Sequence, residues 1–320
     1  MFQQLFHQPH VIRRHLTSPL LASRLRYLTH FIDYLRKERG LSELTIQNYC
    51  YYTQIFLNHI FAQGLSLATI TINQIDALII QEFNKGCARG TIQNFASSLR
   101  AFLRYAQSRG WCQPHIPEAI KSPRIFKHTS LPSSPTWEEV KRLIKTTRGN
   151  NPTNIRDRAL LLLLATYGLR VSEVVRLRLE DIDWVQETIH IIRSKGGQPQ
   201  QFPLTQTVAQ AIIRYLKEVR PRSSYREIFL TRHAPITPLA RQTLSMIVKR
   251  RWKPLNVQIL HSGAHSLRHA CATRLINHGV SLKAIADQLG HRNLETTRIY
   301  AKVDLTQLRK VANINIGGLL

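Results

Sequence analysis

The sequence predicts a mainly α-helical protein of two domains: an N-terminal four-helix bundle and a larger mixed, mostly helical domain with one small antiparallel β-hairpin. Three observations lead to this fold class. Apolar residues recur every three or four positions through residues 20–113, which is typical of amphipathic helices. The pattern stops in the proline-rich interval 114–135. Within the second domain, residues 187–204 contain a β-branched run, a Gly-Gly turn and a second extended run, which together indicate a hairpin.

Four amphipathic stripes build the predicted bundle. They run over Leu21–Leu35, Ile46–Ile60, Ile75–Phe83 and Ile92–Ala106. Four helices of this length bury their apolar faces against one another in a small bundle. Residues 1–19 contain no acidic side chain and are expected to form a flexible basic arm in front of the bundle.

Basic residues around the fourth stripe are candidates for DNA contacts. Arg100 and Arg104 lie opposite its apolar face, and Arg89 stands at its start. A basic helix face of this kind is suited to lie along phosphates, although a solvated helix face has the same pattern. Lys127, in the interval that follows, is a fourth candidate.

Residues 114–135 are expected to form an interdomain linker, because they combine prolines with the absence of a periodic apolar pattern. Thr136 followed by Glu138 and Glu139 has the form of a helix N-cap with acidic residues in the first turn. The second domain is therefore predicted to begin at residue 136 and to occupy the rest of the chain, 136–320.

The charge of the chain points to nucleic acid as its partner. Lys and Arg total 45 against 19 Asp and Glu, a formal net charge of +26, while 43% of the residues remain apolar. This balance indicates a folded protein with a basic surface. A basic protein bound to a membrane surface is the alternative, but such proteins concentrate their charge on one amphipathic segment, and here it runs along the whole chain.

The cysteines and the apolar runs indicate which further classes of protein are not expected. The four cysteines are far apart and form no C-x-x-C pair, so we expect neither a zinc ribbon nor a disulfide framework, and a reducing cytoplasmic location fits. The longest apolar run, Ala159–Ala165, is too short to cross a bilayer and is predicted to be a buried helix segment.

Two candidate phosphate-binding residues occur in the first half of the second domain. In "YGLRVSEVVRL", Gly168 interrupts an apolar helix and Ser172 is a candidate cap for the next one, which leaves Arg170 beside a helix N-terminus. A guanidinium next to free backbone amides is a good anion site. Lys195 stands at the tip of the predicted hairpin, beside two glycines that allow its backbone to approach a ligand closely.

The segment "AHSLRHACATRLINHG" is predicted to be a helix with His265 and Arg268 away from its buried stripe. A titratable imidazole beside a fixed cation suits proton transfer at a phosphate. The four-residue spacing of His261, His265 and His269 also allows a metal site, but the segment contains no acidic ligand and Arg268 would repel a cation, so no metal is expected.

The segment "LGHRNLETTRIYAKVD" carries the last two candidates. Gly290 ends a short predicted helix, His291 follows it, and Tyr300 comes nine residues later. Taken alone, Tyr300 has the features of a packing aromatic. Taken together, two arginines, a lysine, two histidines and a tyrosine supply the cations, acid and nucleophile that phosphoryl transfer needs without a metal. This set predicts DNA strand transfer through a phosphotyrosine, and no ATP-binding loop is present in the sequence.

These motifs, in this order, resemble those of tyrosine recombinases of the phage integrase and Xer group. The resemblance covers about 20–312 and rests on "GLRVSEVVRLRLEDID", the hairpin lysine, "HSLRHACATRL" and "LGHRNLETTRIYAKV". It implies that 20–113 is a core-binding DNA-binding domain and 136–320 the catalytic domain. It further implies that the two close around duplex DNA as a clamp and that four protomers assemble on two recombination sites.

The resemblance also implies a role for each candidate. Arg170 and Arg268 would bind the scissile phosphate, and Lys195 would protonate the departing 5′ oxygen. His265 would act as acid and base, His291 would hydrogen-bond the phosphate, and Tyr300 would attack to form a 3′-phosphotyrosyl link. Glu173 is a candidate to orient Arg170. No cofactor is implied, because the covalent ester conserves the bond energy.

Several biological tasks remain open at this point. The high charge and the basic arm favour integration and excision of a mobile element, and segment inversion and Xer-type resolution of chromosome dimers are alternatives. A DNA-binding relative of the same fold without cleavage and a topoisomerase of related chemistry are the competing molecular functions.

Overall fold

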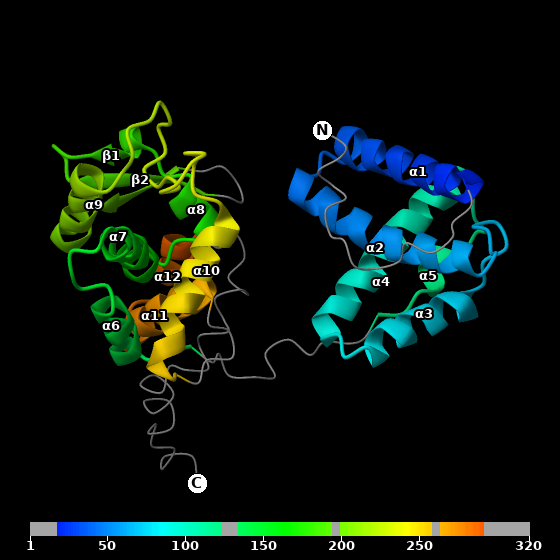
Figure 1. Cartoon of the computed structure of the whole chain (residues 1–320). Helices are drawn as coiled ribbons and strands as arrows, with labels where there is room; N and C mark the ends of the chain where they lie inside the picture. The colour runs from blue at the N-terminus through cyan, green and yellow to red at the C-terminus, as the bar shows by residue number, and fades with distance from the viewer. Residues whose placement is uncertain (1–17, 123–133, 194–198, 258–262, 291–320) are drawn as a thin grey trace, which may run out of the picture. The chain divides into compact units, whose positions relative to one another are not determined.

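The computed structural model describes residues 18–122, 134–193, 199–257 and 263–290. The chain divides into two compact units, Met1–Lys127 and His128–Leu320. The boundary between the units lies inside the interval 114–135. Figure 1 shows the helices and strands of each unit and labels most of them.

The first unit is a helical bundle, as the four apolar stripes predict. Its elements are α1 (Ser18–Asp33), which continues into the π-helical turn η2 (Tyr34–Glu38), then α2 (Glu43–Ala62), α3 (Ile72–Asn84), α4 (Arg89–Ser108) and the short α5 (Ile116–Ala119). Ser42 caps α2 by accepting a hydrogen bond from the backbone N–H of Thr45. The helices pack around buried aromatic rings, with the centroids of Phe31 and Phe102 5.2 Å apart and those of Phe56 and Phe102 6.1 Å apart.

The first unit extends further along the chain than the linker prediction placed it. Ile116 and Ile120 are buried in the core of the bundle, although the linker was expected to begin at residue 114. The Arg100 guanidinium donates hydrogen bonds to the carbonyl oxygen of Ile120 at 2.9 Å and to Ser122 Oγ at 2.8 Å. Two apolar residues four apart were too short a pattern to predict this packing from sequence.

The second unit is mostly helical and contains a three-stranded sheet. Its helices are α6 (Trp137–Lys145), α7 (Pro152–Tyr167), α8 (Val171–Val175), α9 (Gln206–Glu218), α10 (Arg241–Trp252), α11 (Ala264–Asn277) and α12 (Leu282–Leu289), with 3-10 turns η3 (Leu179–Asp181) and η4 (Lys253–Leu255). Its strands are β1 (Ile182–Asp183), β2 (Thr188–Ile192) and β3 (Pro199–Pro203). The strands are antiparallel in the order β1-β2-β3, and Ile189 pairs with Phe202. The predicted hairpin is thus part of this sheet.

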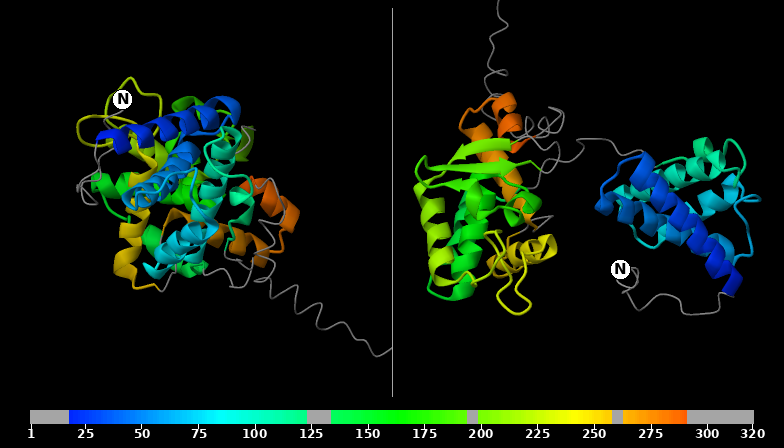
Figure 2. Two further views of the ribbon diagram at one scale, coloured as in Figure 1. Left: turned by 90° about the vertical axis from the view of Figure 1, so that its right-hand side faces the viewer. Right: turned by 90° about the horizontal axis from the view of Figure 1, so that it is seen from above.

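Helix α7 forms the centre of this unit. Its leucines Leu160–Leu164 are all buried, as the apolar run predicted. It packs against α9 and α11, and the buried face of the sheet, with Ile189 and Phe202, joins the same core. The right-hand view of Figure 2 shows the sheet beside the helices of this unit.

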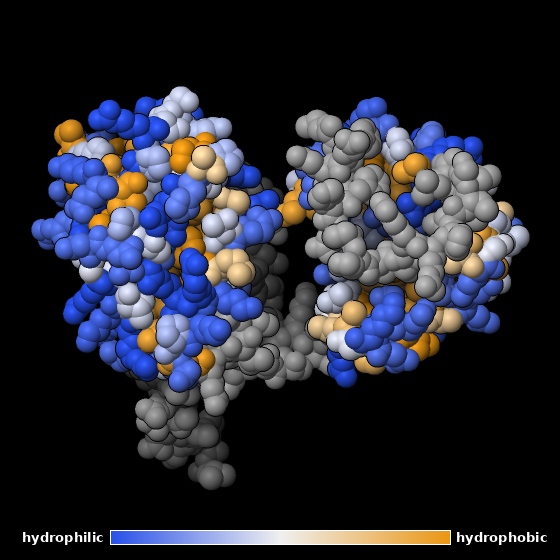
Figure 3. All heavy atoms as spheres, viewed as in Figure 1, coloured by the Kyte–Doolittle hydropathy of each residue, from blue (hydrophilic) through white to orange (hydrophobic). Residues whose placement is uncertain are grey.

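Figure 3 shows mostly hydrophilic side chains on the visible face of the second unit, with scattered apolar ones. Within the described ranges, no helix has both the length and the apolar character needed to span a membrane.

Candidate functional site

The turn between α7 and α8 places Arg170. Gly168 ends α7 in the left-handed conformation, with φ of +62°. A Cβ atom at this residue would lie 2.7 Å from Leu289 Cδ2 and 3.3 Å from Cys271 Sγ. Glycine therefore allows both the reversal of the chain and the close approach of α11 and α12. Arg170 follows as the N-cap residue of α8, so Ser172, the predicted cap, lies within the first turn instead.

Glu173 holds Arg170 by two hydrogen bonds. Its Oε2 accepts from the backbone N–H of Arg170 at 2.8 Å, and its Oε1 accepts from Arg170 Nη1 at 2.9 Å. The Glu173 side chain is fully buried, whereas a quarter of the Arg170 side chain, 25%, is exposed. Burial raises the pKa of the Glu173 carboxyl, but the Arg170 backbone N–H and the charges of Arg193 and Arg170 outweigh it and hold that pKa below its usual value.

Arg193 belongs to the same cluster, although it is not among the residues that the sequence motifs indicate. Its Nη1 donates to Glu173 Oε2 at 3.0 Å, and its Nε donates to Gln200 Oε1 at 2.8 Å. Only 4% of its side chain is exposed. A sequence signal did exist, because Ile189 and Ile191 alternate along β2 and Arg193 continues their spacing one residue beyond its end; all three are buried. The period of two places Arg193 on the inner face of the hairpin.

The C-terminal end of α12 brings these side chains together. The last carbonyl groups of a helix lack partners within the helix and attract cations. Here four consecutive carbonyl oxygens each accept a hydrogen bond from a side chain of another element. The donors are Gln200 Nε2 to Asp287 at 3.1 Å, Arg193 Nη2 to Gln288, Arg268 Nη2 to Leu289 at 2.5 Å and Arg170 Nη2 to Gly290 at 3.1 Å.

The structure therefore brings Arg170 and Arg268 together on adjacent carbonyl groups. Arg268, on α11, also donates from Nη1 to the carbonyl oxygen of Gly168 at 2.7 Å, and only 2% of the residue is exposed. His265, one turn earlier on α11, is exposed, and its ring centroid lies 4.2 Å from that of His269. Two guanidiniums fixed side by side can bind the oxygens of one phosphate.

The remaining predicted site residues lie outside the described residues. These are Lys195, His291, Tyr300, the DNA-contact candidate Lys127 and the third histidine of the metal alternative, His261. In the chain, Lys195 comes two residues after Arg193, and His291 directly follows Gly290. In the described part of the chain, no three side chains of the metal-binding types gather at one point.

Comparison with known proteins identifies the family. The phage integrase family model matches residues 136–307, and the phage integrase N-terminal SAM-like domain model matches 28–110. The tyrosine recombinase XerA of Pyrococcus horikoshii is 31% identical over 283 residues, which covers 88% of this chain and 91% of that one. The chain belongs to the phage integrase family of tyrosine recombinases.

Other integrase relatives agree with this assignment. A Sinorhizobium fredii protein named as an integrase/recombinase, y4rA, is 35% identical over 309 residues, covering 96% of this chain and 72% of that protein. The crystal structure of the XerH site-specific recombinase bound to palindromic difH substrate has the same fold, with a TM-score of 0.67 at 20% identity, over 94% of this chain and 90% of that one.

The predicted DNA contacts in the integrase N-terminal unit differ in their surroundings. Arg89 is exposed at the start of α4. Arg104 Nε lies 3.4 Å from Glu118 Oε1, and the Arg100 guanidinium is bound to the segment after α5. Arg100 thus has a structural role in holding residues 120–122 against α4, which the prediction did not include.

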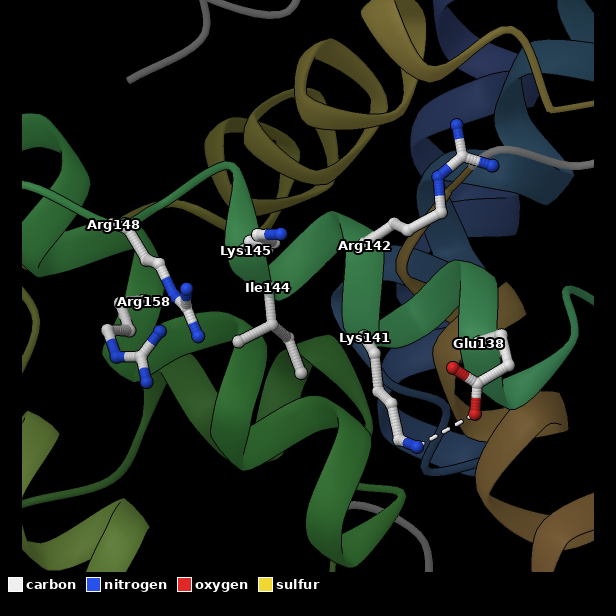
Figure 4. Close-up of a pocket in the computed structure, with 7 residues that line it drawn as sticks. All are labelled: Glu138, Lys141, Arg142, Ile144, Lys145, Arg148 and Arg158. Carbon is white, nitrogen blue, oxygen red and sulfur yellow. Dashed lines mark hydrogen bonds and ion pairs between the residues drawn. The ribbon is translucent and has the colours of Figure 1, made fainter.

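A second basic region of the C-terminal unit lies between α6 and α7. This basic cleft, of about 410 Å³, is lined by Glu138, Lys141, Arg142, Ile144, Lys145, Arg148 and Arg158 (Figure 4). Its one carboxylate, Glu138, is paired with Lys141 at 2.7 Å. Burial lowers the pKa of Arg158, and the charges of Arg148 and Arg214 lower it further. Arg142 donates to the carbonyl oxygen of Leu255, whereas no carboxylate among the described residues pairs with Arg148 or Arg158.

Proposed function

We propose that the protein is a site-specific DNA recombinase that cuts and rejoins DNA strands through a 3′-phosphotyrosyl intermediate, with Tyr300 as the nucleophile. One observation carries the proposal. Arg170 and Arg268 donate to adjacent carbonyl groups at the end of α12, and that helix end leads directly into the chain segment with His291 and Tyr300. The family match at 136–307 includes all of these positions.

In this proposal, the two arginines neutralise the non-bridging oxygens of the scissile phosphate. A guanidinium has five N–H donors, and the two bonds from Arg170 to Glu173 and Gly290 leave others for a ligand. The charge on these oxygens grows in the pentacovalent transition state, so donors that are fixed in advance stabilise it more than the ground state. Glu173 is proposed to hold Arg170 in the orientation that this requires.

The other candidates move protons and form the ester. The Tyr300 phenolate oxygen attacks phosphorus, the bond to the 5′ oxygen breaks, and Lys195 gives that oxygen its proton. His265 accepts and returns the phenol proton, and His291 hydrogen-bonds the phosphate. In the second half of the reaction, a 5′-hydroxyl of another strand attacks phosphorus and releases Tyr300. Each ester bond replaces another, so the reaction needs no ATP.

The proposed partners are duplex recombination sites, held between the core-binding bundle and the catalytic domain, with four protomers on two sites. The net charge of +26 supports the affinity for DNA. The proposed task is integration and excision of a mobile element. Xer-type resolution of chromosome dimers is the alternative, supported by the likeness to XerA along nearly the whole of both chains.

The test is capture of the covalent intermediate. The full-length protein is incubated with a nicked duplex that carries its site, taken from the DNA that flanks its gene, and the products are separated under denaturing conditions. We expect a protein–DNA adduct with the wild type and none with Tyr300→Phe. An undiminished adduct with Tyr300→Phe contradicts the proposed nucleophile. Tight, salt-dependent binding with no adduct from the wild type would indicate the DNA-binding relative without cleavage.

A further inference from the structure

Arg193 contacts both groups that hold Arg170. The first is Glu173, whose Oε1 accepts from Arg170 and whose Oε2 accepts from Arg193 Nη1 at 3.0 Å. The second is the backbone of Gly290, whose carbonyl oxygen accepts from Arg170. A Cβ atom at residue 290 would lie 2.8 Å from Arg193 Nε and 3.0 Å from Arg193 Cδ, so the Arg193 side chain lies directly against this backbone.

Arg193 is itself fixed from the side of the sheet. Its Nε and Nη2 donate to Gln200 Oε1 at 2.8 and 2.5 Å, and its guanidinium carbon lies 5.2 Å from the centre of the Phe202 ring. Its Nη2 also donates to the carbonyl oxygen of Gln288. A planar guanidinium with several donors is needed to reach all of these acceptors at once, because a lysine ammonium is a single point on a flexible stem.

Arg193 uses all three of its guanidinium nitrogens to donate to acceptors of the protein. Its side chain is 4% exposed, whereas the Arg170 side chain is 25% exposed. The two guanidiniums therefore differ in role although they share one carboxylate. Arg170 faces outward with N–H donors to spare, and Arg193 lies behind it.

We propose that Arg193 is a positioning residue that sets the orientation of Arg170 through Glu173 and Gly290, and so controls how well the charge on the scissile phosphate is stabilised. The inference rests on the proposed cleavage reaction. Without Arg193, Glu173 Oε2 would lose one of its donors and keep the Arg170 backbone N–H, and the end of α12 would lose the contact of Arg193 with Gln288. Arg170 would remain in place but with a looser orientation.

The test compares Arg193→Lys with the wild type as full-length proteins on two nicked duplexes. One carries the normal scissile phosphodiester, and the other carries a methylphosphonate at that position, in which a methyl group replaces a charged non-bridging oxygen. We expect Arg193→Lys to lower the single-turnover rate of adduct formation by about 10- to 100-fold on the phosphodiester, because a small misplacement costs rates of this order. The dissociation constant for the duplex should stay within about threefold, since Arg193 acts through Glu173 and Gly290 and not on the DNA.

On the methylphosphonate, the difference between Arg193→Lys and the wild type should shrink to about threefold or less, because the neutral group places less demand on Arg170. Arg170→Lys should show the same pattern. A role confined to stability would instead lower both rates by the same factor, and that result would overturn the inference. Equal rates of Arg193→Lys and the wild type on the phosphodiester would overturn it as well.

Arg251→Lys is the matched control. Arg251 also pairs with a buried carboxylate, that of Asp157, at 2.7 Å, and 16% of its side chain is exposed. It lies on α10 and contacts neither Glu173 nor Gly290 in the described structure. Arg251→Lys should change the adduct rate of folded protein by the same small factor on both duplexes.

A second variant decides the question if Arg193→Lys does not fold. Gln200→Met removes the acceptor that holds Arg193 from β3 but keeps its charged pair with Glu173. We expect Gln200→Met to lower the rate of adduct formation by about three- to tenfold on the phosphodiester and by a smaller factor on the methylphosphonate. An equal loss of rate on both duplexes would overturn the inference. A wild type that forms no adduct overturns the proposed function, and the inference with it.

Discussion

Two groups of arginines in the second unit differ in what surrounds each guanidinium. At the C-terminal end of α7, the group of Arg170, Arg193 and Arg268 donates to one carboxylate and to a row of helix carbonyls. In the first half of the same helix, Arg158 faces the charges of Arg148 and Arg214. Among the described residues, no acidic side chain pairs with Arg158. Ten residues of helix, about 15 Å, separate Arg158 from Gly168.

The difference shows how a charged side chain becomes a fixed part of a site. A buried cation is tolerated only where its donors find acceptors, because the loss of hydration is otherwise too costly. Arg193 and Arg268 are almost completely buried, and their donors have acceptors of this kind. Arg158 stays partly exposed, and its pKa is lowered by burial and by like charges. Acceptors, and not the number of cations, therefore distinguish the candidate site from the basic cleft.

Glu173→Gln should disrupt the group of Arg170, Arg193 and Arg268 and have the largest effect of these variants on the free energy of unfolding. The change leaves Arg193 buried without a counter-charge, and we expect the free energy of unfolding to fall by about 3–5 kcal/mol. Urea denaturation followed by circular dichroism measures it. Glu180→Gln is the control, because Glu180 pairs with Arg178 and Arg226 on the surface and should change the stability little. Equal losses of unfolding free energy in the two variants would mean that burial of the Glu173–Arg193 pair does not affect its contribution to stability.

The pH dependence of the same pair of proteins tests the charge of Glu173. The pKa of Glu173 is lowered in the folded state, below the usual value of 4.5. Its ionised form therefore stabilises the fold fully above that pH, and the contribution is lost as the pH falls through the lower, folded-state pKa. The stability gap between the wild type and Glu173→Gln should close as the solution is acidified below the usual value. A gap that widens in acid would contradict this pairing.

Gly290→Ala should disturb the group of Arg170, Arg193 and Arg268 and lower the free energy of unfolding by an intermediate amount. Gly290 has φ of +63°, and the new Cβ atom would meet Arg193 Nε at 2.8 Å. Gly279→Ala is the matched control, because Gly279 has φ of +78° with no atom within 4 Å of the new Cβ. We expect a loss of about 1–2 kcal/mol for Gly279→Ala from backbone strain, and about 1 kcal/mol more for Gly290→Ala from the clash. Indistinguishable urea midpoints would argue against the close contact with Arg193.

Arg158→Met should have the smallest effect on the free energy of unfolding, and should raise it where the other variants lower it. Methionine keeps the apolar stem and removes a partly buried charge beside Arg148 and Arg214. We expect the free energy of unfolding to rise by up to about 0.5 kcal/mol at low ionic strength, and the gain to shrink with added NaCl. Arg214→Met is the control, because it loses contacts with Glu218 and Asn150 and should bring no gain. Destabilisation by Arg158→Met would show that the basic cleft contains a stabilising acceptor.

Most elements of the fold were predictable because their signals are local. The apolar stripes correspond to α1, α2, α3 and α4, the leucine run corresponds to the buried α7, and the β-branched run corresponds to β2, which pairs with β3. The motif residues Arg170, Glu173 and Arg268 could be selected because their spacing and their neighbours suit an anion site. The prediction that Ser172 caps α8 was wrong. Serine favours helix caps, but Arg170 is the N-cap residue here, and the Glu173 carboxylate accepts the hydrogen bond from its backbone N–H.

The sequence by itself determined the family, the order of helices and strands, and the residues that are suited to phosphate chemistry, because periodicity, capping and motif order are properties of neighbouring residues. Only the tertiary structure decided which acceptor each guanidinium has. Arg170 and its acceptor Gly290 are 120 residues apart, and Arg193 and Gln288 are 95 apart. Such pairs form only when α7, the sheet, α11 and α12 pack together, and the burial of Arg193 follows from that packing and from the acceptors at the end of α12.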